Sequence, residues 1–188
     1  MSEVKDLQAG RLLVASPELR DPNFADTVVL LLEVNAEGAL GVVLNRPTPV
    51  PVADVLDPWA LSVATPDVLF QGGPVSKDAA IAVALLSDVD DAPLGFRPVL
   101  GRLGVLDLDT PVELVDGSLS GLRIFAGYAG WGAGQLDGEV DEGAWYVVDS
   151  EPHDAFSDAA ARLWAGVLRR QPGDLKLHAT RPVDPELN

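Results

Sequence analysis

The sequence lacks cysteine and long apolar runs. A chain without cysteine has no thiol nucleophile, no redox pair and no iron–sulfur cluster, and it lacks the usual ligands of structural zinc. No stretch approaches the roughly 20 apolar residues of a membrane-spanning helix. The first residues also lack the charged-then-apolar pattern of a signal peptide. We therefore expect a cytoplasmic protein that does not bind membranes.

Basic residues are scarce, since 13 Lys and Arg stand against 29 Asp and Glu and the formal net charge is −16. A protein that grips nucleic acid through its phosphates needs clustered cations. Here the cations are scattered singly, apart from Arg169 and Arg170 at the end of an expected helix, where they suit the helix dipole. The charge balance therefore argues against direct nucleic-acid binding, and the acidity itself favours solubility.

Several enzyme signatures are also missing. The chain contains no P-loop and no His-Glu-x-x-His motif, and Leu119 stands where a nucleophile elbow needs serine. The glycines at 127, 130, 132 and 134 do not have the spacing of a dinucleotide-binding loop. Neither His153 nor His178 belongs to an evident nucleophile–base pair. The residues favour binding over catalysis, and we expect no cofactor.

What is present is an ordinary globular composition: 188 residues, 47% hydrophobic and 22% charged. This length predicts one domain over residues 1–188, with loose termini at 1–9 and about 174–188. Apolar runs predict strands, and helical spacing predicts helices. The expected strands cover residues 11–15, 27–32, 40–44, 67–71, 99–108, 122–128 and 145–148, and the expected helices cover 53–60, 135–142 and 157–170. Strands first and one long helix late indicate an α+β domain with a mixed sheet.

The first candidate site segment is Asn45-Arg46-Pro47, at the end of an expected buried strand. Arg46 stands apart from other cations. It either organises a loop through a salt bridge or presents its planar fork to a carboxylate or phosphate. The second segment contains Gly72 and Gly73, which form a tight turn or offer backbone N–H groups to an anion.

The third segment spans residues 127–139 and carries two aromatic side chains after a strand. Tyr128 and Trp131 belong to the core, or they form an apolar wall for a flat ligand or a partner side chain. Gln135, Glu139 and Glu142 share one face of the following helix. That face is solvated, or its oxygens reach a metal.

The same segments resemble the AlgH/YqgE family of bacterial proteins. The matching stretches are residues 10–17, 21–24, 27–29, 38–47, 72–75, 127–131, 134–136 with Glu139, and 143–145. The resemblance implies a compact α+β domain with a large mixed sheet, flanked by helices, in the bacterial cytoplasm. It implies no settled activity, although some members are labelled transcriptional regulators. The family often has Glu-His-Asn where this chain has Glu33-Val34-Asn35, so chemistry that needs that histidine is not expected here.

Our leading hypothesis is a binding module whose site forms where strand ends converge, for a small anionic ligand or a protein partner. The candidate site residues are Asn45, Arg46, Gly72, Gly73, Tyr128, Trp131 and Gln135. The alternative is a hydrolase or metal-assisted enzyme that uses Asp21, Glu139 or Glu142. A third hypothesis is an adaptor anchored by Trp131 or Trp59.

Overall fold

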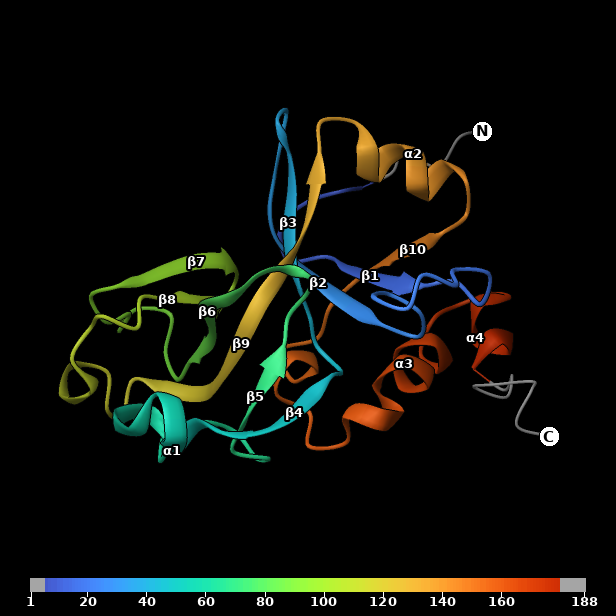
Figure 1. Cartoon of the computed structure of the whole chain (residues 1–188). Helices are drawn as coiled ribbons and strands as arrows, with labels where there is room; N and C mark the ends of the chain where they lie inside the picture. The colour runs from blue at the N-terminus through green and yellow to red at the C-terminus, as the bar shows by residue number, and fades with distance from the viewer. Residues whose placement is uncertain (1–5, 180–188) are drawn as a thin grey trace.

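The structure, a computed structural model, describes residues 6–179 and is built around one large curled sheet (Figure 1). Its strands are β1 (Leu12–Ala15), β2 (Val28–Asn35), β3 (Gly38–Val43), β4 (Pro47–Pro51), β5 (Val68–Gln71), β6 (Val75–Leu86), β7 (Phe96–Leu100), β8 (Leu103–Leu106), β9 (Leu119–Gly132) and β10 (Trp145–Val148). Its helices are α1 (Val52–Val55), α2 (Gln135–Asp141), α3 (Ala160–Arg169) and α4 (Leu175–His178), with 3-10 turns η1 (Asp57–Trp59), η2 (Val112–Leu114) and η3 (Asp154–Phe156).

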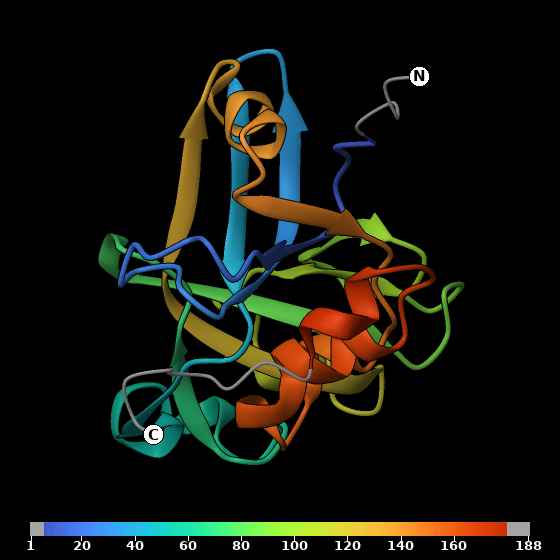
Figure 2. The ribbon, with the colours of Figure 1, turned by 90° about the vertical axis from the view of Figure 1, so that its right-hand side faces the viewer.

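The strands follow the order β10-β1-β2-β3-β9-β6-β8-β7, and β5 pairs with both β4 and β9. All these pairings are antiparallel except that of β5 with β9, so the sheet is mixed. Figure 2 shows α3 and α4 packed on one side of the molecule. The predicted fold class, a single α+β domain with a large mixed sheet flanked by helices, is confirmed.

Strand β9 is the longest strand and belongs to two parts of the sheet. Its residues 119–126 and Tyr128 pair with β6 on one edge, and residues 129–132 pair with β3 on the other edge. Gly127 interrupts the pairing with β6, and its φ of +76° is a conformation that other residues rarely adopt. The pairing with β6 therefore ends just past a glycine, and the rest of β9 pairs with β3.

The outer ends of β2, β3 and β9 project from the rest of the molecule as a three-stranded arm, residues 33–40 and 129–132 (Figures 1 and 2). Residues directly opposite one another in an antiparallel pair point to the same face. The pairing therefore forms cross-strand rows. The rows are Glu33–Leu40–Gly130 and Asn35–Gly38–Gly132 on one face, with Val34–Ala39–Trp131 on the other.

Three apolar clusters fill the fold. The largest lies between the curled sheet and α3, whose stripe Leu163, Trp164, Val167 and Leu168 is buried as its spacing predicts. The second lies under α2 and contains Trp131, Leu136 and Trp145. The third lies near α1 and contains Trp59. Because Trp59 is only 3% exposed, the hypothesis that it anchors a partner is wrong.

Most predicted elements are present, and the differences have local causes. The hairpin of residues 27–32 and 40–44 forms as β2 and β3. The strand expected over 99–108 is instead a hairpin, β7 and β8, which turns at Gly101 with a φ of +57°. The prolines at 47, 49 and 51 do not end regular structure. They form β4, which pairs with β5 at two positions only.

The two ends of the chain differ in what the structure describes. Residues 1–5 and 180–188, parts of the expected loose termini, lie outside the described residues. The described part of the expected loose C-terminus, residues 174–179, contains α4. The ring of His178 on this helix stacks on Tyr146, with centroids 5.6 Å apart. No helix in residues 6–179 has the length and apolar character needed to cross a membrane.

Candidate functional site

Tyr128 and Trp131 do not form one apolar wall. The sequence suggests a strand that ends at residue 128 and a turn that carries both aromatics, but β9 continues to Gly132. Side chains alternate between the faces of a strand, so positions 128 and 131 point to opposite sides. Tyr128 packs against the largest cluster and Trp131 lies in the second cluster. The prediction of a shared wall is therefore wrong.

Trp131 belongs to an aromatic group built around one carboxylate. Its ring stacks on Phe24 at 6.1 Å and meets Trp145 edge-on at 6.1 Å. The indole Nε1–H groups of Trp131 and Trp145 both donate to Glu139 Oε2, at 2.6 and 3.4 Å. Glu139 is therefore a hydrogen-bond acceptor that fixes two buried indoles, because a buried N–H needs a partner.

The other acidic and amide groups of α2 also have local roles. Gln135 Oε1 accepts from the backbone N–H of Gly132 at 3.0 Å, which closes the turn between β9 and α2. Glu142 is exposed at the end of the helix. Across residues 6–179, no three His, Asp or Glu side chains gather in a way that could hold a metal ion. The weak metal candidates Glu139 and Glu142 gain no further ligand.

Asn45 and Arg46 organise the loop of residues 21–27. Asn45 accepts from the N–H of Val28 and donates to the carbonyl of Asp26. The guanidinium of Arg46 donates to three carbonyls of this loop, those of Pro22, Asn23 and Ala25. Burial lowers the pKa of Arg46, while nearby acidic charges oppose that shift. The geometry matches the loop-organising alternative for Arg46, with carbonyls in place of the expected carboxylate.

The loop held by Arg46 connects it indirectly with Trp131. Phe24, on the same loop, is the ring that stacks on Trp131. Asp21, considered above for catalysis, accepts from the N–H of Asn23 and so helps to shape the loop. These contacts make residues 21–27 a strap that covers the aromatic group.

Gly72 and Gly73 let two backbones pass closely. A Cβ added at Gly72 would lie 2.3 Å from the carbonyl oxygen of Gly127, and one at Gly73 would lie 2.2 Å from the backbone of Tyr128. The N–H of Gly72 donates to the carbonyl of Ala126 at 2.9 Å, so it is not available to an anion. These glycines do allow the close backbone approach that was expected, and the backbone that they approach is that of β9.

The predicted site residues therefore fall into two places. Residues 43–46 lie beside residues 71–72, since Val43 N–H donates to Gly72 and Gln71 N–H donates to Arg46. Gly73 lies against Tyr128, three positions before Trp131 on β9. Trp131 and Gln135 stand further along, on the arm, and are linked to Arg46 only through the loop that carries Phe24.

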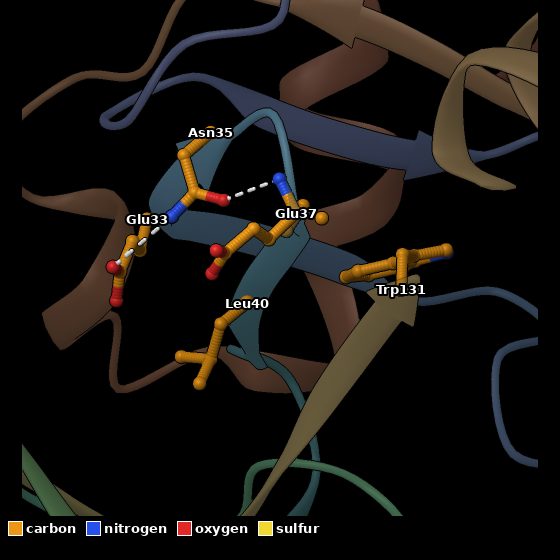
Figure 3. A pocket seen from close by; sticks show the side chains of 7 residues that line it. Glu33, Asn35, Glu37, Leu40 and Trp131 are labelled. Atoms are coloured by element: carbon orange, nitrogen blue, oxygen red, sulfur yellow. Dashed lines mark hydrogen bonds between the residues drawn. The ribbon is translucent and has the colours of Figure 1, made fainter. Parts of the chain in front are cut away.

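An open hollow of ≈ 230 Å³ lies at the tip of the arm. Figure 3 shows its labelled side chains, which come from the β2–β3 hairpin and from the end of β9. The lining residues are Glu33, Asn35, Glu37, Gly38, Ala39, Leu40 and Trp131. Glu33 and Glu37 are exposed, whereas Val34 is half-buried against the cluster that contains Trp131. A side chain at position 34 therefore faces away from Glu33 and Asn35.

A larger hollow of ≈ 570 Å³ lies at the start of α3, lined in part by Thr65, His153, Asp154 and Ser157. Two of its polar side chains, Asp154 and Ser157, accept hydrogen bonds from within the protein. Asp154 is 6% exposed and forms a two-pronged ion pair with Arg170, whose pKa is raised by this hydrogen bond. The backbone carbonyls of Thr65 and Ser157, which line this hollow, accept hydrogen bonds from a buried arginine.

That arginine, Arg123, is a buried charged residue that the sequence analysis missed. It is 1% exposed, lies 4.1 Å over the Phe70 ring and donates to the carbonyls of Thr65, Ala155 and Ser157. Burial lowers its pKa to about 10, so the group is still a cation at neutral pH. The signal in the sequence is a single cation inside an apolar strand, which is rare without partners.

Comparisons with known proteins agree on one family. The family model DUF179, described as AlgH-like, matches residues 12–176. A UPF0301 protein of Streptomyces avermitilis is 58% identical over 100% of this chain and 98% of its own length. One of Mycobacterium tuberculosis is 45% identical over 95% and 89%.

Two solved structures share the fold. Protein DIP2367 of Corynebacterium diphtheriae has a TM-score of 0.90 and 32% identity, with 95% of each chain covered. The solution structure of the AlgH protein of Pseudomonas aeruginosa has a TM-score of 0.70 and 28% identity, with 97% of this chain and 98% of that chain covered. The chain belongs to the AlgH-like family.

Proposed function

We propose that this protein is a binding module that works through a protein partner in the bacterial cytoplasm, and that the partner docks at the tip of the arm. The observation that carries the proposal is the hollow beside the exposed hairpin. At ≈ 230 Å³ it is smaller than the roughly 300–1,000 Å³ of pockets that enclose a whole small molecule. A hollow of this size fits one side chain of a larger partner.

The surroundings of the hollow disfavour an anionic small molecule. Its exposed charged side chains, Glu33 and Glu37, are acidic. Arg46, the cation expected to pair with an anion, donates to loop carbonyls instead. Any regulatory role would therefore be indirect and exerted through the partner, because a net charge of −16 opposes direct contact with DNA.

Site-specific photo-crosslinking tests the proposal. Ala36, at the exposed tip of the hairpin, is replaced by a photo-reactive amino acid, and the variant is expressed in a Streptomyces host. The control places the same group at Leu94, which is 82% exposed on a distant loop. We expect a discrete protein adduct from position 36 and none of that size from position 94. No adduct at 36, or the same adduct at both positions, would exclude docking at the tip.

A further inference from the structure

Strand β6 extends beyond the strand that flanks it on one side. β8 pairs with residues 82–85 of β6 and ends at Leu106, opposite Ala82. On this side, no backbone within residues 6–179 hydrogen-bonds to residues 75–81. Just before Ala82, the side of β6 that faces β8 therefore becomes an open sheet edge, which is a template for pairing with another chain.

The open edge presents main-chain groups at Ala80, which is exposed. Ala80 lies opposite Ala126 of β9, and the carbonyl of Ala126 accepts from the N–H of Gly72 on the far side of β9. In an antiparallel ladder, pairs that exchange hydrogen bonds alternate with pairs that do not. Ala80 and Ala126 form a pair of the second kind. The N–H and C=O of Ala80 therefore point away from β9, into the space that β8 leaves empty.

A hollow of ≈ 450 Å³ lies along the same edge. Its apolar wall includes Leu56, Ile81 and Leu108, each only partly buried against the core. A free N–H and C=O beside an apolar hollow match an extended peptide, because such a peptide supplies an acceptor and a donor at the spacing of a strand and a side chain for the hollow.

The charge at the hollow determines which peptide fits. Asp107 and Asp109 line it and are exposed. Asp107 Oδ1 accepts from the N–H of Asp109, and within residues 6–179 neither carboxylate forms an ion pair. On β6 itself, the charges of Lys77 and Asp78 offset each other. A basic segment is therefore complementary, whereas a second copy of this chain, with its net charge of −16, is repelled.

We propose that the open edge of β6 binds an extended, basic segment of a partner protein, which adds as a strand beside Ala80. The main chain of the segment exchanges hydrogen bonds with Ala80, and one of its apolar side chains fills the hollow. A Lys or Arg of the segment pairs with Asp107 or Asp109. This surface shares no residue with the hollow at the tip of the arm, so the inference goes beyond the proposed function and does not depend on it.

The first experiment uses the full chain labelled with ¹⁵N and a blocked peptide of sequence Lys-Val-Thr-Val-Lys as the probe. The control peptide is Glu-Val-Thr-Val-Glu. We expect NMR shift changes at the amides of residues 79–82 and 105–109, with about tenfold tighter binding of the basic peptide. No shift change at residues 79–82 with millimolar basic peptide, or equal binding of the two peptides, would overturn the proposal. Shifts confined to residues 33–40 would also overturn it and leave docking at the arm standing.

The second experiment removes the main-chain donor with Ala80→Pro. The substitution breaks no hydrogen bond of the protein, because this N–H has no partner in the described structure, and proline is tolerated on an open edge. We expect a folded protein that binds the basic peptide about tenfold more weakly. Ala80→Ser keeps the N–H and is the matched control, with unchanged binding. Unchanged binding by a folded Ala80→Pro protein would refute strand addition.

A third variant keeps the test decisive if Ala80→Pro does not fold. Asp109→Asn removes one charge at the hollow, and we expect about threefold weaker binding of the basic peptide at low salt, a difference that salt screens. Asp116→Asn, an exposed position outside the hollow, is its control. Equal binding by the two variants would refute the basic partner. Shift changes at residues 79–82 when the peptide-free protein is concentrated would show a second copy at this edge and overturn the proposal.

Discussion

The two halves of β9 use glycine for opposite purposes. In the inner half, residues 119–127, Gly127 passes close to Gly73. A Cβ added at Gly127 would lie 2.6 Å from the carbonyl oxygen of Gly73. In the outer half, residues 128–132, a Cβ added at Gly130 or Gly132 would make only an ordinary contact, at 3.7 or 3.9 Å. A glycine is therefore not evidence of structural need by itself. The atoms that a Cβ would meet decide whether the fold or a surface property depends on it.

The largest effect is expected for Gly127→Ala in the inner half. The substitution forces a side chain into a left-handed conformation, which costs about 1–2 kcal/mol, and into contact with the carbonyl of Gly73. Overpacking adds about 1–3 kcal/mol. We expect a loss of about 2–5 kcal/mol in the free energy of unfolding, measured by urea denaturation. The control is Gly166→Ala on α3, where the Cβ has open space. Equal stability of the two variants would contradict this account of the crossing.

A smaller loss is expected for Arg123→Met, also in the inner half. The substitution removes the donors from the carbonyls of Thr65, Ala155 and Ser157, of which only Ala155 is a buried residue. We expect a loss of about 2 kcal/mol, because an unsatisfied buried acceptor costs about 1–3 kcal/mol and methionine recovers part through packing. Arg97→Met, at an exposed position of β7, is the control. A loss below about 1 kcal/mol would mean that water replaces the guanidinium at these carbonyls.

In the outer half, Glu139→Ala tests the carboxylate that holds Trp131 and Trp145. Both indole N–H groups lose their acceptor, so we expect a loss of about 1.5–2 kcal/mol and a change in tryptophan fluorescence. Glu139→Gln keeps an acceptor oxygen and is expected to restore about half of the stability. Glu142→Ala, one turn away and exposed, is the control. Fluorescence identical to that of the unsubstituted protein would show that the indoles do not depend on Glu139.

The smallest effect is expected for Gly130→Ala. Its Cβ meets only the Tyr128 ring at ordinary contact distance, and alanine is less flexible than glycine in the unfolded chain. We expect a change within about 0.5 kcal/mol, or a slight gain, in thermal unfolding. A loss of more than about 1.5 kcal/mol would place Gly130 with the glycines that the fold requires.

The sequence was sufficient where one physical rule decides the structure. Apolar runs predicted β2, β3 and β10, and helical spacing predicted α3, because burial on one face or on both fixes such elements. The pattern did not predict that β9 continues through residues 129–132. That stretch is rich in glycine, and its pairing with β3 supplies the order that its own residues do not.

The candidate site was harder to predict because it depends on which segments meet. The sequence identified Asn45, Arg46, Gly72 and Gly73 as neighbours of strand ends, and they do lie together. It could not show that Arg46 donates to carbonyls of residues 22–25, since those contacts are long-range. The sequence analysis named Glu33 and Asn35 only because they flank Val34, where the family often has histidine. Their place beside the hollow follows from the register of β2 and β3.

The sharing of β9 between two parts of the sheet has a consequence for how the protein unfolds. β6 and β3 both pair with the same continuous strand, so unfolding of β9 breaks the pairing in both parts of the sheet. The chain should therefore melt in one cooperative step, with the amides of residues 122–126 among the slowest to exchange their hydrogens. Two fragments cut between residues 86 and 96 would each lack a needed neighbour, and they would regain structure only when mixed.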